Sequence, residues 1–258
     1  MLACADCPFA LLTHRQWPSP NWETLRRHAQ TLRVVSLNCA GGNILAAREV
    51  KPYHPDIVLL QESPDRRALT GLAHELYGNS ASILWGPDAS IIAHGQLLPR
   101  AQQRNRSDFS QARVKLLSGI ECEVVSWRLS PPIFRADLWS PTCWRQQYQD
   151  RIDRRNEVIG IYRQACIFSN GVPLIIGGDC NTPAGDGALR PLRNRLSDTF
   201  TRAGMGWGNT CINDLPFARI DQIWVNRSLR PVAVFAKKTR YSDHRLVICD
   251  LVLTSQAK

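Results

Sequence analysis

Short apolar runs rich in β-branched residues recur from residue 32 to the end of the chain, and turn-forming residues separate them. Each run is only a few residues long and is bounded by Gly, Pro, Asn or Asp, which is typical of buried strands. A chain with this pattern is expected to fold around β-sheets. The predicted strands are LRVVSLN, DIVLLQE, ASIIAH, ECEVVSW, PLIIGGD, RIDQIWVN, PVAVFA and LVICDLVL.

Helix-like segments lie between these runs. The longest of them carries apolar residues at spacings that place them on one face of a helix. Many strands with a few interspersed helices favour an α/β fold, with two packed mixed β-sheets flanked by helices. The predicted helical segments are residues 46–53, 65–76, 148–168 and 188–203.

The chain shows no internal repeat and no linker, so we expect one domain over residues 31–254. Residues 1–30 contain several prolines and a basic patch, and we interpret them as an N-terminal extension. Within that extension, Cys4 and Cys7 are spaced like a metal or redox pair, but without a second pair we expect free thiols. The nine cysteines of the chain are odd in number and scattered, which argues against a disulfide framework.

The charge balance indicates the kind of partner. The chain has 32 Lys and Arg against 22 Asp and Glu, a net charge of +10, which favours polyanions such as nucleic acid or phosphate esters. No stretch approaches the roughly 18 consecutive apolar residues that a membrane-spanning helix needs. The N-terminus lacks the basic region of a secretory signal, so we expect a cytoplasmic protein, and we expect a monomer.

Two basic segments could contact such a partner. Residues 100–113 are polar and basic, and we expect a solvated loop or a hairpin tip there. The second segment alternates aromatic and basic residues, which can stack bases and hold phosphates, or can pack on the domain as an ordinary loop. Both interpretations of this segment stay open. If it binds substrate, Arg145 is a candidate substrate-binding residue. The segment contains Phe134, Trp139, Trp144 and Tyr148 among Arg135, Arg145, Arg151, Arg154 and Arg155.

Polar residues stand at or beside the ends of several predicted strands. Side chains that leave neighbouring strand ends can converge at one edge of a sheet. Carboxylate and amide oxygens suit a hard cation such as Mg²⁺, and an Asp can position or deprotonate water. An Asp-oriented His can act as a base or as a cation facing a phosphate. The candidates are Asn38, Glu62, Asp179, Asn181, Asp221, Asp243 and His244.

The order of these residues along the chain matches the motif order of a known superfamily. The chain resembles the endonuclease/exonuclease/phosphatase superfamily, of the pancreatic deoxyribonuclease and abasic-site endonuclease type. That resemblance implies a four-layered α/β sandwich, dependence on Mg²⁺ or Mn²⁺, and in-line attack of water on a phosphoester phosphorus. The matching markers are SLN at 36–38, QE at 61–62, GDCN at 178–181, RID at 219–221 and SDH at 242–244.

The resemblance also implies residue roles. Glu62, Asn38 and Asp243 are expected to hold the metal. Asp179 is expected to align the attacking water, and Asn181 to bind a phosphoryl oxygen. Asp221 and His244 are similar to the Asp–His pair of the superfamily.

Two positions depart from the superfamily pattern. Arg128 stands where many members have a histidine that donates to the phosphate, and Arg is a poor proton donor at neutral pH. We therefore expect Arg128 to bind the phosphate without protonating the leaving group. Cys180 replaces a larger apolar residue, and we expect a buried thiol there. Trp207 lies within a glycine-rich turn that contains Gly204, Gly206 and Gly208, and it is expected to line the substrate cleft.

The sequence therefore predicts a metal-dependent phosphodiesterase, with DNA as the favoured substrate. A phosphatase or pyrophosphatase acting on a lipid or another small phosphoester is the alternative, because residues 197–221 are similar to a bacterial branch of the superfamily that includes membrane-associated proteins. A module of the same fold that binds a polyanion with little turnover is a further alternative. A purely structural role would not explain why Asp, Asn and His recur at strand ends.

Overall fold

The computed structural model describes residues 31–98, 108–132, 135 and 137–254. The predicted N-terminal extension with Cys4 and Cys7, the part of the basic stretch at 100–107, and Phe134 lie outside the described residues. The predicted domain boundaries stay predictions.

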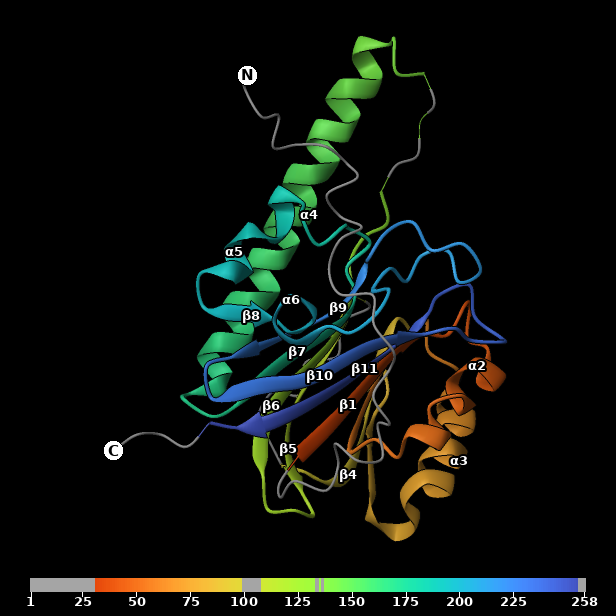
Figure 1. The fold of residues 1–258 in the computed structure, drawn as a ribbon, viewed down its shortest axis with the longest axis vertical. Coiled ribbons are helices and arrows are strands. Elements are labelled where there is room, and N and C mark those ends of the chain that lie inside the picture. Colours follow the sequence, from red (N-terminus) through yellow and green to blue (C-terminus); the bar gives the residue numbers. More distant parts are fainter. Residues whose placement is uncertain (1–30, 99–107, 133–134, 136, 255–258) are drawn as a thin grey trace.

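The described strands form one curled mixed sheet (Figure 1). Its order is β10-β11-β1-β2-β4-β5-β6-β7-β9-β8, and β3 pairs with β4 at the side. All eight predicted runs occur as strands. The bounds are β1 (Thr31–Asn38), β2 (Ile57–Gln61), β3 (Ala81–Leu84), β4 (Ala89–Leu97), β5 (Phe109–Leu116), β6 (Glu121–Arg128), β7 (Leu174–Asp179), β8 (Leu196–Asp198), β9 (Asp221–Asn226), β10 (Leu229–Lys237) and β11 (Leu246–Leu253).

The sheet has two halves, β10-β11-β1-β2-β4 and β5-β6-β7-β9-β8, which face each other across a shared core. Val34 of β1, Ile91 of β4, Val124 of β6 and Ile223 of β9 are fully or almost fully buried in one apolar cluster. Two strand pairs are parallel, β1 with β2 and β6 with β7. Since parallel strands end at the same edge of a sheet, each half presents two carboxyl ends side by side.

Helices cover the outer faces of both halves (Figure 1). Helices α2 (Ile44–Arg48) and α3 (Arg66–Tyr77) pack on β1 and β2, while α4 (Pro141–Ser169) and α5 (Arg190–Arg193) pack on β6 and β7. The predicted mixed α/β fold with flanking helices is confirmed, and the number of layers stays a prediction. The remaining elements are α6 (Thr199–Ala203) and the short 3-10 helices η2 (Lys51–Tyr53), η3 (Gly78–Ser80) and η4 (Gly187–Leu189).

The structure describes only the last part of the segment 100–113, for which the sequence predicts a solvated loop or hairpin tip. That prediction is wrong for residues 109–113, which belong to a strand. Strand β5 begins at Phe109, whose side chain is buried. Polar residues that follow are also buried and are paired within the fold: Ser110 Oγ donates to Ala89 O, and Gln111 Nε2 donates to Glu123 Oε1. Because these polar side chains face the interior, the strand shows no apolar alternation in sequence.

The single helix predicted over residues 188–203 is also wrong. The segment contains η4, α5, the short strand β8 and α6. Strand β8 pairs antiparallel with β9, and Asp198 at its end caps α6 by accepting from Phe200 N. Pairing with β9 thus overrides the local helical pattern. Helix α4 begins at Pro141, earlier than the predicted residue 148.

Within the described ranges, no helix is both long enough and apolar enough to span a bilayer. The seven cysteines that the structure describes are free thiols. Cys180 is fully buried, as predicted.

Candidate functional site

Strand pairing brings the predicted residues to one edge of the sheet. Asn38 and Gln61 are register partners at the carboxyl ends of β1 and β2. Arg128 and Asp179 are partners at the ends of β6 and β7, and Asp179 also faces Asp221 at the start of β9. The two halves of the sheet thus place their chemical groups at a common edge.

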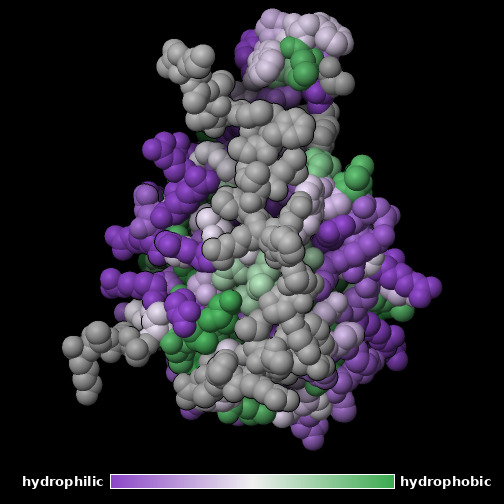
Figure 2. Space-filling view, in the orientation of Figure 1, coloured by the Kyte–Doolittle hydropathy of each residue, from purple (hydrophilic) through white to green (hydrophobic). Residues whose placement is uncertain are grey.

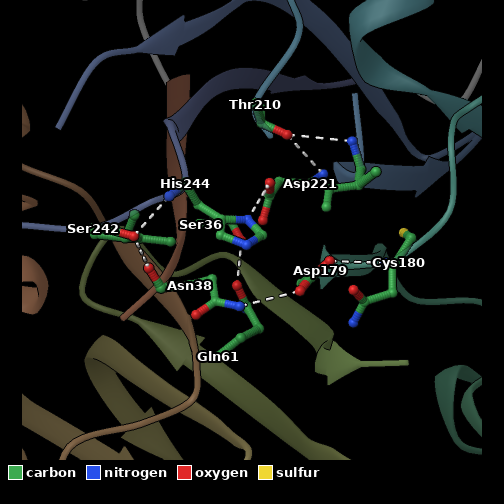
Figure 3. A network of polar contacts seen from close by, with 12 residues as sticks. Ser36, Asn38, Gln61, Asp179, Cys180, Thr210, Asp221, Ser242 and His244 are labelled. Atoms are coloured by element: carbon green, nitrogen blue, oxygen red, sulfur yellow. Dashed lines mark hydrogen bonds and ion pairs between the residues drawn. The ribbon is translucent and has the colours of Figure 1, made fainter. Parts of the chain in front are cut away.

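Three of these residues form a compact buried cluster (Figure 3). Ligand atoms of Asp179, Asp221 and His244 all lie within 4.8 Å of one another. His244 Nδ1 lies 2.9 Å from Asp221 Oδ2, which orients the imidazole and leaves Nε2 for other contacts. The predicted Asp–His pair is therefore present as a contact in the structure.

Asn38 joins this cluster to Glu62. Its Nδ2 donates to Glu62 Oε1 and to Asp179 Oδ2, both at 3.1 Å. Its Oδ1 accepts from Ala40 N at 3.0 Å, which fixes the orientation of the amide. Asn38 therefore turns its nitrogen, and not its carbonyl oxygen, toward the two carboxylates.

Arg128 points at Glu62. Its Nε and Nη2 lie 3.1 and 2.9 Å from Glu62 Oε1, and its Nη1 lies 3.8 Å from Asp88 Oδ1. The second oxygen of Glu62, Oε2, accepts from Gly41 N at 2.7 Å. Both carboxylate oxygens of Glu62 thus have donors within the protein.

Asn181 lies beside Asp179 with its side chain partly exposed. Its backbone N donates to Asp179 Oδ1 at 2.8 Å, which holds that carboxylate from the other side. Its Nδ2 donates to Leu129 O at 2.8 Å and retains a second hydrogen. That hydrogen can serve a phosphoryl oxygen.

The two positions before Asp179 require glycine, because neighbouring atoms lie too close to the backbone there for a Cβ atom. A Cβ at Gly178, whose φ is +138°, would lie 2.1 Å from Trp127 O. A Cβ at Gly177 would lie 2.8 Å from Leu59 Cδ1, on the facing half of the sheet. Larger residues would push β7 away and displace Asp179.

Burial and charge shift the pKa values of the cluster. Desolvation, and then the nearby Asp221 carboxylate, raise the pKa of Asp179 to about 7. Burial alone would lower the pKa of His244, but the Asp221 carboxylate, together with those of Asp179 and Asp243, outweighs it and raises that pKa to about 10. Partial burial likewise opposes the charged form of Glu62, yet its contacts with Asn38 and Arg128 lower its pKa. The site thus combines anionic groups with an imidazolium.

The donor set fits a divalent cation. Asp221 Oδ1 is buried, and no described residue donates a hydrogen bond to it. Carboxylate oxygens are the ligands that Mg²⁺ or Mn²⁺ prefers. The carboxylates of Asp179, Asp221 and Glu62 therefore supply the donor chemistry of a metal site, while His244, as an imidazolium, adds a positive charge beside them.

Sequence reasoning overlooked residues that hold the cluster in place (Figure 3). Thr210 Oγ1 accepts from Asp221 N at 3.1 Å, and Ser242 Oγ both donates to Asn38 O and accepts from His244 N. Gln61 Nε2 donates to Ser126 Oγ at 3.2 Å between the two halves. Ser242 and Gln61 stood inside the marker strings, whereas no local pattern marked Thr210.

Three predicted site residues lie away from the cluster. Asp243 is exposed next to His244, outside the buried group. Trp207 lines a separate small cavity of about 120 Å³ together with Lys237 and Arg245. Arg145 is exposed on the part of α4 that projects beyond the body (Figure 1). Their predicted roles stay proposals.

The chain belongs to the Endonuclease/Exonuclease/phosphatase family, whose sequence pattern matches residues 35–244. Members of this family are hydrolases that act on phosphoester bonds. No curated protein matches the sequence significantly.

Solved structures share the fold. A family member from Bacteroides thetaiotaomicron superposes with a TM-score of 0.67 at 14% identity, covering 87% of this chain and 98% of that one. A mannosyl-6-phosphatase from the same species has a TM-score of 0.66 at 15% identity, covering 86% and 100%. A humanized TDP2 from D. rerio has a TM-score of 0.60 at 18% identity, covering 86% and 98%. At these identities the likeness concerns the fold alone.

Proposed function

We propose that this protein is a divalent-metal-dependent phosphoesterase that hydrolyses its substrate by in-line attack of water on phosphorus. The observation that carries the proposal is the convergence of Asp179, Asp221 and His244 within 4.8 Å, with Asn38 linking Asp179 to Glu62. Family membership supports the reaction class.

Each residue has a role that its contacts support. Asp179 is held from two sides by Asn38 and Asn181, so its carboxylate can align a water and take a proton from it. The second hydrogen of Asn181 Nδ2 can donate to a phosphoryl oxygen. His244, kept cationic by Asp221, can face the negative charge that develops on the phosphoryl group.

The proposed cation site lies around Glu62, with Asn38 and Asp243 as the further predicted ligands. A bound Mg²⁺ or Mn²⁺ would neutralise phosphate charge and favour attack by water. Asn38 would have to turn its carbonyl oxygen inward to act as a ligand, since Oδ1 now accepts from Ala40 N. Arg128 would have to leave Glu62, and its guanidinium could then bind the substrate phosphate.

The net charge of +10 supports a polyanionic substrate, with DNA as the first candidate. A lipid pyrophosphate or another small phosphoester is the second candidate, and the exposed apolar side chains near the site, described below, favour it. Fold relatives described as TDP2 and as a mannosyl-6-phosphatase are compatible with either class.

A substrate panel tests the proposal. The purified chain is incubated with Mg²⁺ or Mn²⁺, and with a chelator as control, against duplex DNA, single-stranded DNA, a chromogenic phosphodiester and a prenyl pyrophosphate. We expect cation-dependent hydrolysis of at least one substrate. Binding to DNA without any turnover on the panel would contradict the enzymatic proposal and favour a polyanion-binding module.

A further inference from the structure

Exposed apolar side chains are distributed unevenly over the molecule. Thirteen large apolar residues of the described ranges are exposed, and ten of them lie at the edge of the sheet that carries the site. The other three are Leu117 in the turn before β6, Ile167 near the end of α4, and Leu253 at the end of β11, all at the opposite edge. We call the ten residues, in segments 138–148 and 207–217 and at Leu45 and Tyr241, the apolar rim.

The first part of the apolar rim is the projecting start of α4 (Figure 1). Trp139 is 84% exposed, Trp144 59% and Tyr148 68%. Arg151, one turn further along the helix, donates to Asp186, so this helix face meets the loop that follows Asp179 and Asn181. Figure 2 shows hydrophobic surface at the tip, beside residues of intermediate hydropathy. The three described aromatic residues of this segment are thus mostly exposed and do not pack into the described core.

The second part is the loop before β9. Leu215 is 81% exposed and Phe217 65%. The same loop carries Thr210, which holds Asp221 in the site. Exposed apolar side chains therefore lie on two separate segments at this edge of the sheet, and one of these segments also contacts the cluster.

Positively charged side chains lie at the same edge as these apolar residues. Arg66, Arg67, Arg145 and Arg240 are exposed at the site edge, and none forms an ion pair with another described residue. The acidic residues nearby are mostly neutralised at close range: Asp186 pairs with Arg151, and Asp214 with Lys238. Asp65 and Asp243 are exposed exceptions. The apolar rim is thus bordered by four arginines that form no ion pair with another described residue.

We propose that the apolar rim docks on a lipid bilayer that carries anionic headgroups. Trp and Tyr are amphipathic and favour the boundary between headgroups and acyl chains, while arginines can pair with headgroup phosphates. Contiguous or clustered exposed apolar surface that cations border is a feature of interaction sites. Docked in this way, the cluster of Asp179 and His244 faces the bilayer, where it can reach the phosphoester of a membrane amphiphile.

A nucleic-acid strand fits the same edge less well. Stacking on bases would use the aromatic residues, but it gives no favourable contact to Leu138, Ile212 or Leu215, all more than half exposed. Acyl chains or their boundary bury aliphatic and aromatic side chains alike. The aliphatic residues of the apolar rim thus favour a bilayer over a nucleic-acid strand as the partner.

Vesicle binding tests the docking proposal without any turnover. The full chain is sedimented with vesicles of phosphatidylglycerol and phosphatidylcholine, and with vesicles of phosphatidylcholine alone. We expect binding to the anionic vesicles, and about a tenfold loss of affinity in Trp139→Ser/Trp144→Ser and in Leu215→Ser/Phe217→Ser, because each pair removes apolar contact. All four side chains are exposed, so unchanged thermal unfolding is expected.

The matched control is Leu117→Ser/Ile167→Ser, which removes equally exposed apolar residues from the opposite edge. It should bind vesicles like the wild type. Absence of vesicle binding by the wild type, or equal binding by the rim pairs and the wild type, would overturn the proposal. Single-stranded DNA binding that is lost in the rim pairs while vesicle binding persists would instead assign the surface to nucleic acid. Neither result bears on the phosphoesterase proposal, because no step of hydrolysis is measured.

Discussion

At the scale of single residues, Arg128 and Glu62 form an ion pair at the place where the cation site is proposed. Glu62 Oε1 already receives Arg128 Nε and Nη2 together with Asn38 Nδ2. A divalent cation that approaches this oxygen meets a fixed positive charge, so the guanidinium and the metal compete for one carboxylate. A substrate phosphate gives Arg128 another anion to bind.

Removing the guanidinium is therefore expected to strengthen metal binding in the absence of substrate. We predict that Arg128→Gln binds Mn²⁺ about tenfold more tightly than the wild type, because the competing charge is gone. Titration followed by electron paramagnetic resonance of free Mn²⁺ measures this directly, without turnover.

Arg230→Gln is the matched control, since Arg230 is exposed on β10 near the opposite edge and has no ion pair among the described residues. It makes the same change in net charge. Equal or weaker Mn²⁺ binding by Arg128→Gln than by this control would show that Arg128 does not oppose the cation.

At the scale of elements, Asp198 joins β8, α6 and the strand that carries Asp221. It accepts from Phe200 N as the cap of α6, and both guanidinium nitrogens of Arg219 donate to it at 2.9 and 2.5 Å. Arg219 stands two residues before Asp221. The cap and the ion pair together fix the approach of this segment to the site.

Loss of this junction should destabilise the fold. We predict that Asp198→Ala lowers the free energy of unfolding by about 3 kcal/mol, since it removes a helix cap and leaves Arg219 without its partner. Asp198→Asn keeps a capping oxygen and should lose less. Urea denaturation at neutral pH measures both, and midpoints equal to the wild type would contradict the role.

The same junction predicts a pH dependence for these variants. Burial opposes the charged form of Asp198, but Arg219 outweighs it and lowers the pKa below 3.8. Stability from this carboxylate is thus fully present above pH 3.8 and is lost as the pH falls through the folded-state value. The wild type should therefore lose its advantage over Asp198→Asn only in acid.

Elements were predictable from sequence where burial followed a simple pattern. Strand β11 occurs at the predicted bounds, Leu246–Leu253, because its residues are apolar almost throughout. Strand β5 was missed because Ser110 and Gln111 are buried through hydrogen bonds, and β8 because it gains its pairing only from distant β9. Tertiary partners of this kind leave no local signal.

At the scale of the whole molecule, the site exists because the two halves of the sheet meet. Asn38 and Glu62 come from one half, and Asp179 and Asp221 from the other, and the Asn38 amide links the Glu62 and Asp179 carboxylates. The residue types and their order in the chain were enough to predict these members. The exposure of Asp243 and Trp207 was not predictable because it depends on loop paths, and that of Arg145 because it depends on how far α4 extends beyond the body.

The most direct test of the account is the rate of chromogenic phosphodiester hydrolysis by the wild type and by Asp179→Asn, with Mn²⁺ and with a chelator. Asn38 and Asn181 hold the buried Asp179 carboxylate. In the proposed mechanism this carboxylate takes a proton from the attacking water, and an amide of the same shape cannot take it. We predict cation-dependent turnover in the wild type and at least about a 10³-fold loss in Asp179→Asn, with unchanged thermal unfolding. Near wild-type turnover by Asp179→Asn, or wild-type turnover that survives the chelator, would contradict the account.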